Sequence, residues 1–146
     1  AELVEEFFPS RAKEDLVFRL LYSVLQAIKG KGDLGIVSRY FEAWFLQING
    51  LLPDFRRCRK CRKRLTVGGW LSPRMDGVYC GACAPLKKDA VPAEFVPFLN
   101  WVRKNAPPMA GGPSCPAAQL EAIGRVLQSI IVYHLEREPK SLHFLK

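Results

Sequence analysis

The 146-residue chain has the composition of a folded protein, with 49% apolar and 25% charged residues. This composition excludes an intrinsically disordered chain, and no apolar run reaches the roughly 18 residues that a membrane-spanning helix needs. The first residues carry glutamates and no basic stretch, so we expect no signal peptide, no membrane contact and a cytoplasmic location.

The first half of the chain predicts a pair of helices. Residues 10–30 form the first, because apolar residues recur about every four positions until Gly30 and Gly32 stop the helix. Its expected inner stripe is Leu16, Val17, Leu20, Leu21, Val24, Leu25 and Ile28. A second helix is predicted over about 34–49, and the short connection makes the two an antiparallel hairpin. The aromatic residues of the second helix follow the helical period, which favours core packing over a binding groove.

Four cysteines in two pairs are the most informative feature of the sequence. Cys58 and Cys61 form one CxxC pair, Cys80 and Cys83 form another, and eighteen residues separate the pairs. This spacing is typical of a structural zinc site, in which four thiolates hold one ion and leave no position for water. The alternatives are two disulfides, which need an oxidising compartment, or a redox motif, which needs a βαβ context. The spacing favours one structural zinc ion.

The segment between the cysteine pairs is predicted to be a small β module. Short strands are expected at residues 65–67, 70–71 and 78–79, with a hairpin turn at Asp76 and Gly77. So short a segment cannot bury a sufficient core, and we expect the metal to supply much of its stability.

Positive charge is concentrated around the first cysteine pair. Seven cations lie there: Arg56, Arg57, Arg59, Lys60, Arg62, Lys63 and Arg64. They account for nearly all of the net charge of +8. A zinc ion with four thiolates carries a formal charge of −2, and two or three cations would balance it. We therefore predict that the seven bind nucleic acid, with charge balance as the alternative.

The second half predicts two further helices, over about 92–105 and 117–137, separated by a Pro/Gly-rich loop. Cys115 in that loop is expected to be a free thiol, because the four-cysteine site is complete without it. No phosphate-binding loop, nucleophile elbow or HExxH motif occurs. We therefore predict that the protein is not an enzyme and has no small-molecule substrate.

Together these patterns predict a mainly α fold class with an inserted β module. The helical domain is expected in two parts, residues 1–55 and residues 89–146. The zinc-ribbon-like module is expected between them, at residues 56–88.

Three separated segments resemble the C-terminal part of the bacterial recombination mediator family RecO: residues 41–55, 68–83 and 133–145. The resemblance implies a helical domain with an inserted zinc module. It also implies a role in DNA repair and homologous recombination: binding single-stranded and also double-stranded DNA, annealing strands and helping to load recombinase. The implied partners are RecR and the acidic tail of single-strand-binding protein, with the protein located at the nucleoid.

The chain departs from the family pattern in places. RecO proteins begin with an OB-fold, and no β-rich segment of that kind precedes Ser10, so we expect a C-terminal fragment or a lost domain. Arg62 stands where the family usually has glycine, and Pro139 where it has an aliphatic residue. Two other functions stay open: a stand-alone zinc-ribbon module in transcription or RNA handling, and a zinc-stapled interaction domain without nucleic-acid contact.

Overall fold

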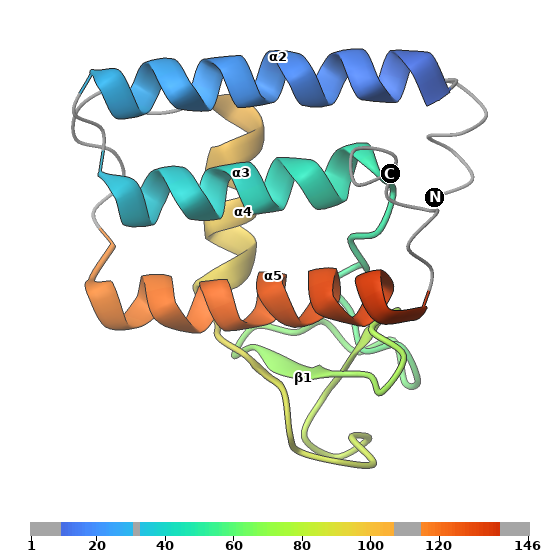
Figure 1. Cartoon of the computed structure of the whole chain (residues 1–146). Helices are drawn as coiled ribbons and strands as arrows, with labels where there is room; N and C mark the ends of the chain where they lie inside the picture. The colour runs from blue at the N-terminus through green and yellow to red at the C-terminus, as the bar shows by residue number, and fades with distance from the viewer. Residues whose placement is uncertain (1–9, 31–32, 107–114, 138–146) are drawn as a thin grey trace.

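Helices dominate the part of the chain that the computed structural model describes, residues 10–30, 33–106 and 115–137. Helix α3 (Leu34–Ile48) lies between α2 (Ser10–Lys29) and α5 (Ala117–Arg137), and α4 (Phe95–Lys104) crosses behind α3 (Figure 1). The predicted mainly α fold class with a small β part is confirmed. Within the described ranges no helix is both long and apolar enough to cross a lipid bilayer.

A three-stranded antiparallel sheet lies beside α5, in the order β2-β1-β3. Its strands are β1 (Gly69–Leu71), β2 (Val78–Tyr79) and β3 (Ala90–Val91). The prediction of β1 and β2 is confirmed, but the strand expected at residues 65–67 is wrong. There the backbone N–H of Leu65 donates to the carbonyl oxygen of Arg56 at 2.8 Å, in the loop behind the first cysteine pair.

The sequence did not predict β3, because its two residues show no alternating pattern and, unlike β2, it is not preceded by an Asp-Gly turn signal. This strand pairs with β1, with Gly69 opposite Val91 and Trp70 opposite Ala90. Since β3 lies beyond residue 88, we propose that the inserted module extends to Val91.

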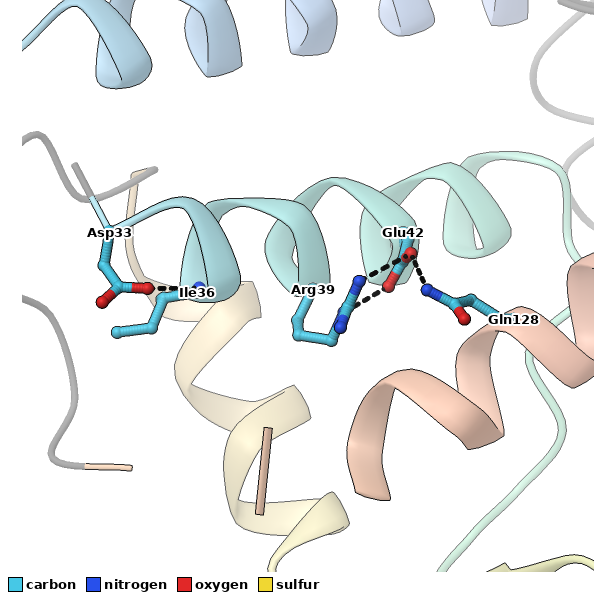
Figure 2. Close-up of polar contacts among 5 residues, drawn as sticks. All are labelled: Asp33, Ile36, Arg39, Glu42 and Gln128. Carbon is cyan, nitrogen blue, oxygen red and sulfur yellow. Dashed lines mark hydrogen bonds and ion pairs between the residues drawn. The ribbon is translucent and has the colours of Figure 1, made fainter. Parts of the chain in front are cut away.

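Helix α3 is buried on most of its circumference. Its buried residues are Ile36, Val37, Tyr40, Ala43, Phe45, Leu46 and Ile48. The helix begins with a side-chain cap, because the carboxylate of Asp33 accepts from the backbone N–H of Ile36 at 3.1 Å (Figure 2). A helix buried on several sides needs a neighbour on each of them, and α3 has α2, α4 and α5 as its neighbours.

Two aromatic side chains of α3 tie it to α4 with polar contacts. The indole N–H of Trp44 donates to the carbonyl oxygen of Val102 at 3.2 Å. The hydroxyl of Tyr40 donates to the carbonyl oxygen of Asn105 at 2.6 Å, just past the end of α4. Both acceptors belong to the last carbonyls of a helix, which have no partner within the helix itself.

A part-buried ion pair within α3 accepts a hydrogen bond from α5 (Figure 2). The guanidinium of Arg39 meets the carboxylate of Glu42 through two contacts, at 2.5 and 3.0 Å. Gln128 on α5 donates to the same carboxylate at 3.0 Å. A Cβ on Gly124 would lie 2.4 Å from Nη1 of Arg39, so this glycine gives the guanidinium room against α5.

The inner face of α2 is narrower than the sequence predicted. Val17, Val24 and Ala27 are buried, and Lys13 is also buried at 1% exposure. Leu25 and Ile28, which we expected to face inward, are 49% and 42% exposed, so that part of the prediction is wrong. The reason is that α2 packs mainly against one helix, α3, and one neighbour covers only a narrow stripe.

The predicted helices in the second half are confirmed as α4 and α5, and both bury apolar residues at helical spacing. The ring of Phe95 at the start of α4 lies 4.4 Å, centroid to centroid, from that of Phe55, which precedes the first cysteine pair. Both rings are buried, so they join the helical part to the chain entering the module. The Pro/Gly-rich loop at 107–114 and the tail after residue 137 lie outside the described residues.

We expect Phe95→Ala to lower the free energy of unfolding by about 3 to 5 kcal/mol, because it removes a fully buried aromatic ring and leaves a cavity. Denaturant unfolding followed by circular dichroism measures this change. Leu86→Ala is the control, because Leu86 is 62% exposed and such a surface change shifts stability by no more than about 0.5 kcal/mol. Equal stabilities of the two variants would contradict the structure at this joint.

Candidate metal centre

The four predicted cysteine ligands come together in one cluster. Cys58, Cys61, Cys80 and Cys83 place their sulfur atoms within 4.8 Å of one another. The Cys61 and Cys80 sulfurs are 3.8 Å apart, and a tetrahedral ion with metal–sulfur bonds of about 2.3 Å needs sulfurs about 3.8 Å apart. A disulfide needs sulfurs at about 2.05 Å, and all four cysteines are free thiols. The cluster therefore fits a metal ion, and it does not form disulfides.

Tight backbone turns position each pair. In the first pair, the N–H of Arg62 donates to the carbonyl oxygen of Cys58 at 2.9 Å. In the second, the N–H of Cys83 donates to the carbonyl oxygen of Cys80 at 3.1 Å. Arg62 has a φ of 67°, in the left-handed region that glycine adopts without steric cost. The turn therefore holds an arginine in a conformation that costs an L-residue about 1 to 2 kcal/mol.

Without a metal ion, the electrostatics of the cluster favour a thiolate at Cys58 but a protonated thiol at Cys83. Burial raises the pKa of the Cys58 thiol, but hydrogen bonds from the backbone of Cys61, Cys80 and Lys60 outweigh burial and lower that pKa to about 6. Hydrogen bonding with the Cys80 side chain raises the pKa of Cys83 to about 12, because a second thiolate beside the first is unfavourable. A divalent cation removes this conflict, since four thiolates can then ionise around one positive centre.

The fifth cysteine lies apart from the cluster. Cys115 precedes α5, and its sulfur lies 3.7 Å from Oε1 of Gln119 on that helix. Burial, and next the nearby carboxylate of Glu94, raise the pKa of this thiol. The prediction that Cys115 is a free thiol apart from the four-cysteine site therefore agrees with its position.

All seven predicted nucleic-acid-binding cations are exposed, but they differ in their partners. Arg56 pairs with Asp54 at 3.2 Å, and Arg59 pairs with Asp76 at 3.5 Å. Arg57 donates to the carbonyl oxygen of Arg62 at 3.2 Å. Four cations form neither an ion pair nor a side-chain hydrogen bond within the described ranges: Lys60, Arg62, Lys63 and Arg64. We call these four the free cations.

Arg59 is held more firmly than the others. A Cβ on Gly77 would lie 2.6 Å from Cδ of Arg59, so the arginine stem lies directly over this glycine. Its guanidinium also donates to the carbonyl oxygen of Asp76 at 3.2 Å. The acidic partners were missed in the sequence, although Asp54, two residues before Arg56, is close enough in the chain to have been noticed.

Comparisons with known proteins agree on one family. The family model described as "Recombination protein O C terminal" matches residues 1–143. Curated relatives named DNA repair protein RecO are 26% identical over 146 residues in Dehalococcoides mccartyi strain 195 and 29% identical over 151 residues in Desulforudis audaxviator. Each alignment covers 99% of this chain but only 58% and 59% of the relative. No solved structure matches the chain.

We expect Cys58→Ser to abolish stoichiometric metal binding, because three thiolates and a hydroxyl no longer complete the site, and the module then loses most of its folding free energy. Elemental analysis of the purified protein should find about one metal ion per chain before the change. Cys115→Ser is the matched control and should retain the metal. Loss of metal from the Cys115 variant and its retention in the Cys58 variant would overturn the ligand assignment.

Proposed function

Because the chain belongs to the RecO family, matching its C-terminal region, we propose that it binds DNA in repair and recombination, in a binding role and not a catalytic one. The curated relatives are named DNA repair proteins, and this chain spans 58% of the length of one and 59% of another. That this chain shares the activity of the longer relatives is therefore part of the proposal.

The observation that carries the proposal is the cluster of free cations on the first cysteine pair. Lys60, Arg62, Lys63 and Arg64 are exposed and form no ion pair within the described ranges. Binding to phosphates therefore breaks no internal ion pair, and released counterions add favourable entropy. The conformation of Arg62 supports the same reading, because a cation is kept where glycine would be less strained.

We propose zinc as the metal, held by Cys58, Cys61, Cys80 and Cys83. Four soft thiolates in a tetrahedral arrangement are typical of zinc. The ion would be structural, since the protein fills every ligand position. Its task is to hold the backbone turn that carries the free cations.

The annealing and recombinase-loading steps implied by the family are also proposals. Two single strands repel each other through their phosphates, and a surface that neutralises phosphates lowers this repulsion. Phosphate contacts carry no base information, so the surface would serve strands of any sequence.

A groove between the module and α5 supports the proposed protein partner. It measures about 660 Å³ and is lined by basic and apolar side chains, among them Lys88, Arg125, Arg137, Met75, Val126 and Val132. Asp89 and Glu136 also line it, so three cations face two carboxylates. We propose that the acidic tail of single-strand-binding protein, which ends in an apolar residue, binds here. RecR stays a partner predicted by resemblance.

The groove is tested with a fluorescent acidic peptide that ends in an apolar residue. We expect Arg125→Glu to weaken peptide binding about tenfold, because it places a like charge at the groove. Arg103→Glu makes the same charge change on α4, away from the groove lining, and should leave the affinity within about twofold. Equal effects of the two variants would show that the peptide responds only to net charge.

The DNA proposal is tested by replacing the four free cations with glutamine. We expect weaker binding to a single strand and a log–log salt slope flattened by up to about 3, from about 0.7 per lost phosphate contact. Fluorescence anisotropy over a salt series measures both quantities, with metal content checked in parallel.

The control variant removes the same charge elsewhere, at the exposed residues Lys29, Lys87, Arg103 and Lys104. It should keep the slope of the unchanged protein. If the free-cation variant keeps its metal and its full affinity, nucleic acid is not the ligand of this surface, and the zinc-stapled interaction domain becomes the better interpretation. Tighter binding to an RNA strand than to DNA of the same sequence would favour the RNA-handling alternative.

A further inference from the structure

Two aromatic side chains lie next to each other on the outer face of the sheet. Trp70 on β1 is directly opposite Tyr79 on β2, and Ala90 on β3 is opposite Trp70 on its other side. The neighbouring pair Leu71 and Val78 is buried, so it defines the inner face. Because side chains alternate along a strand, the row of Tyr79, Trp70 and Ala90 faces away from the core. We call Trp70 and Tyr79 the aromatic pair.

The aromatic pair is partly exposed and does not belong to the hydrophobic core. Neither residue is among the partly buried side chains that pack against the core cluster, whereas Trp44 and Trp101 are. Within the described ranges neither ring forms a contact with another aromatic ring, and neither the indole N–H of Trp70 nor the hydroxyl of Tyr79 has a hydrogen-bond partner. Trp and Tyr side chains bury large areas when they serve as core, so this placement calls for another role.

The aromatic pair lies beside the basic segment. The backbone N–H of Arg59 donates to the carbonyl oxygen of Val78 at 2.8 Å, so the first cysteine pair runs along the free edge of β2. Tyr79 is the next residue of that strand. The module therefore carries two partly exposed rings on its sheet, with Arg59 at the adjoining edge of β2 and the free cations following Arg59 in the chain.

We propose that Trp70 and Tyr79 form a stacking platform for unpaired bases of a single strand whose phosphates contact the free cations. This inference rests on the proposed DNA-binding function and adds to it the form of the nucleic acid. Base stacking on aromatic rings tolerates any sequence, because every base has a π face. A duplex keeps its bases stacked inside and cannot use such a platform.

The adjoining positive charge identifies the occupant as a nucleic-acid strand. A neutral apolar peptide would gain nothing from the cations beside β2, and an acidic peptide would leave its charges spread along an edge that is open to solvent. A single strand satisfies both surfaces at once, with phosphates along the edge of β2 and bases on the face of the sheet.

The test compares two probes on the full metal-loaded chain: a thymidine oligonucleotide, and a strand of equal length in which abasic residues keep every phosphate but carry no base. We expect the thymidine strand to bind at least about fivefold more tightly for each stacked base. Trp70→Leu together with Tyr79→Leu should lower its affinity to that of the abasic strand, with an unchanged salt slope. Trp70→Phe should retain most of the difference, because a phenyl ring still stacks.

Each outcome separates this inference from the proposed function. Equal affinity of the unchanged protein for both strands would overturn the platform and leave DNA binding intact, whereas no binding to either strand would overturn the DNA proposal itself. If the leucine variant loses its metal, photocrosslinking of the unchanged protein to a strand with 5-iodouracil replaces it. Crosslinks at Trp70 or Tyr79 support the platform, and crosslinks at other residues alone refute it.

Discussion

Packing of α3 against three other helices is the constraint on which the helical part depends. Its buried face extends from Ile36 to Ile48, and α2, α4 and α5 each cover a part of it. The polar contacts at the ends of these interfaces then become specific, because the ion pair of Arg39 and Glu42 and the indole of Trp44 must find partners where the packing places them. A shift of α3 by one turn would break the contacts that cross to other helices, which are the hydrogen bond from Gln128 to Glu42 and the one from Trp44 to Val102.

The β module is held together by a different interaction from the one that stabilises the helical part. It has three short strands and little apolar surface to bury, so four sulfurs replace a helix as its organising centre. Two connections orient it against the helices: the contact between the tilted rings of Phe55 and Phe95, and the contact between β3 and α5. The surfaces of the module therefore keep a defined position relative to α5, which a flexibly linked zinc finger would not have.

The positively charged side chains of the module fall into two groups: those that pair with carboxylates of the module, and those that form no ion pair. Asp54 and Asp76 neutralise Arg56 and Arg59, and the stem of Arg59 lies over Gly77. The free cations follow Arg59 in the chain and form no ion pair within the described ranges, although the charge of Arg62 also acts on Asp54. Composition alone cannot make this distinction, because it counts seven equivalent positive charges. Only the geometry of the carboxylates divides them.

The long helices could be predicted from the sequence because their apolar spacing persists over many turns, and the four cysteines because their spacing reflects metal geometry. Short or context-dependent features could not. The strand formed by Ala90 and Val91 carries no periodic signal, and the exposure of Leu25 depends on how many neighbours α2 has. The alignment of Trp70 with Tyr79 depends on strand register, which the turn between them sets.

The insertion of the module between α3 and α5 has a consequence for the order of folding during synthesis. The third strand of the sheet ends at Val91, and by then all four cysteines that could hold a metal ion have been synthesised. The side of α3 that packs against α5 stays uncovered until α5, which ends at Arg137, has been synthesised. The segment with the four cysteines would thus leave the ribosome while the upstream pair of helices, α2 and α3, still exposed the apolar surface that α5 later covers. Chaperone contact during translation should therefore concentrate on α3, and it should end when α5 emerges.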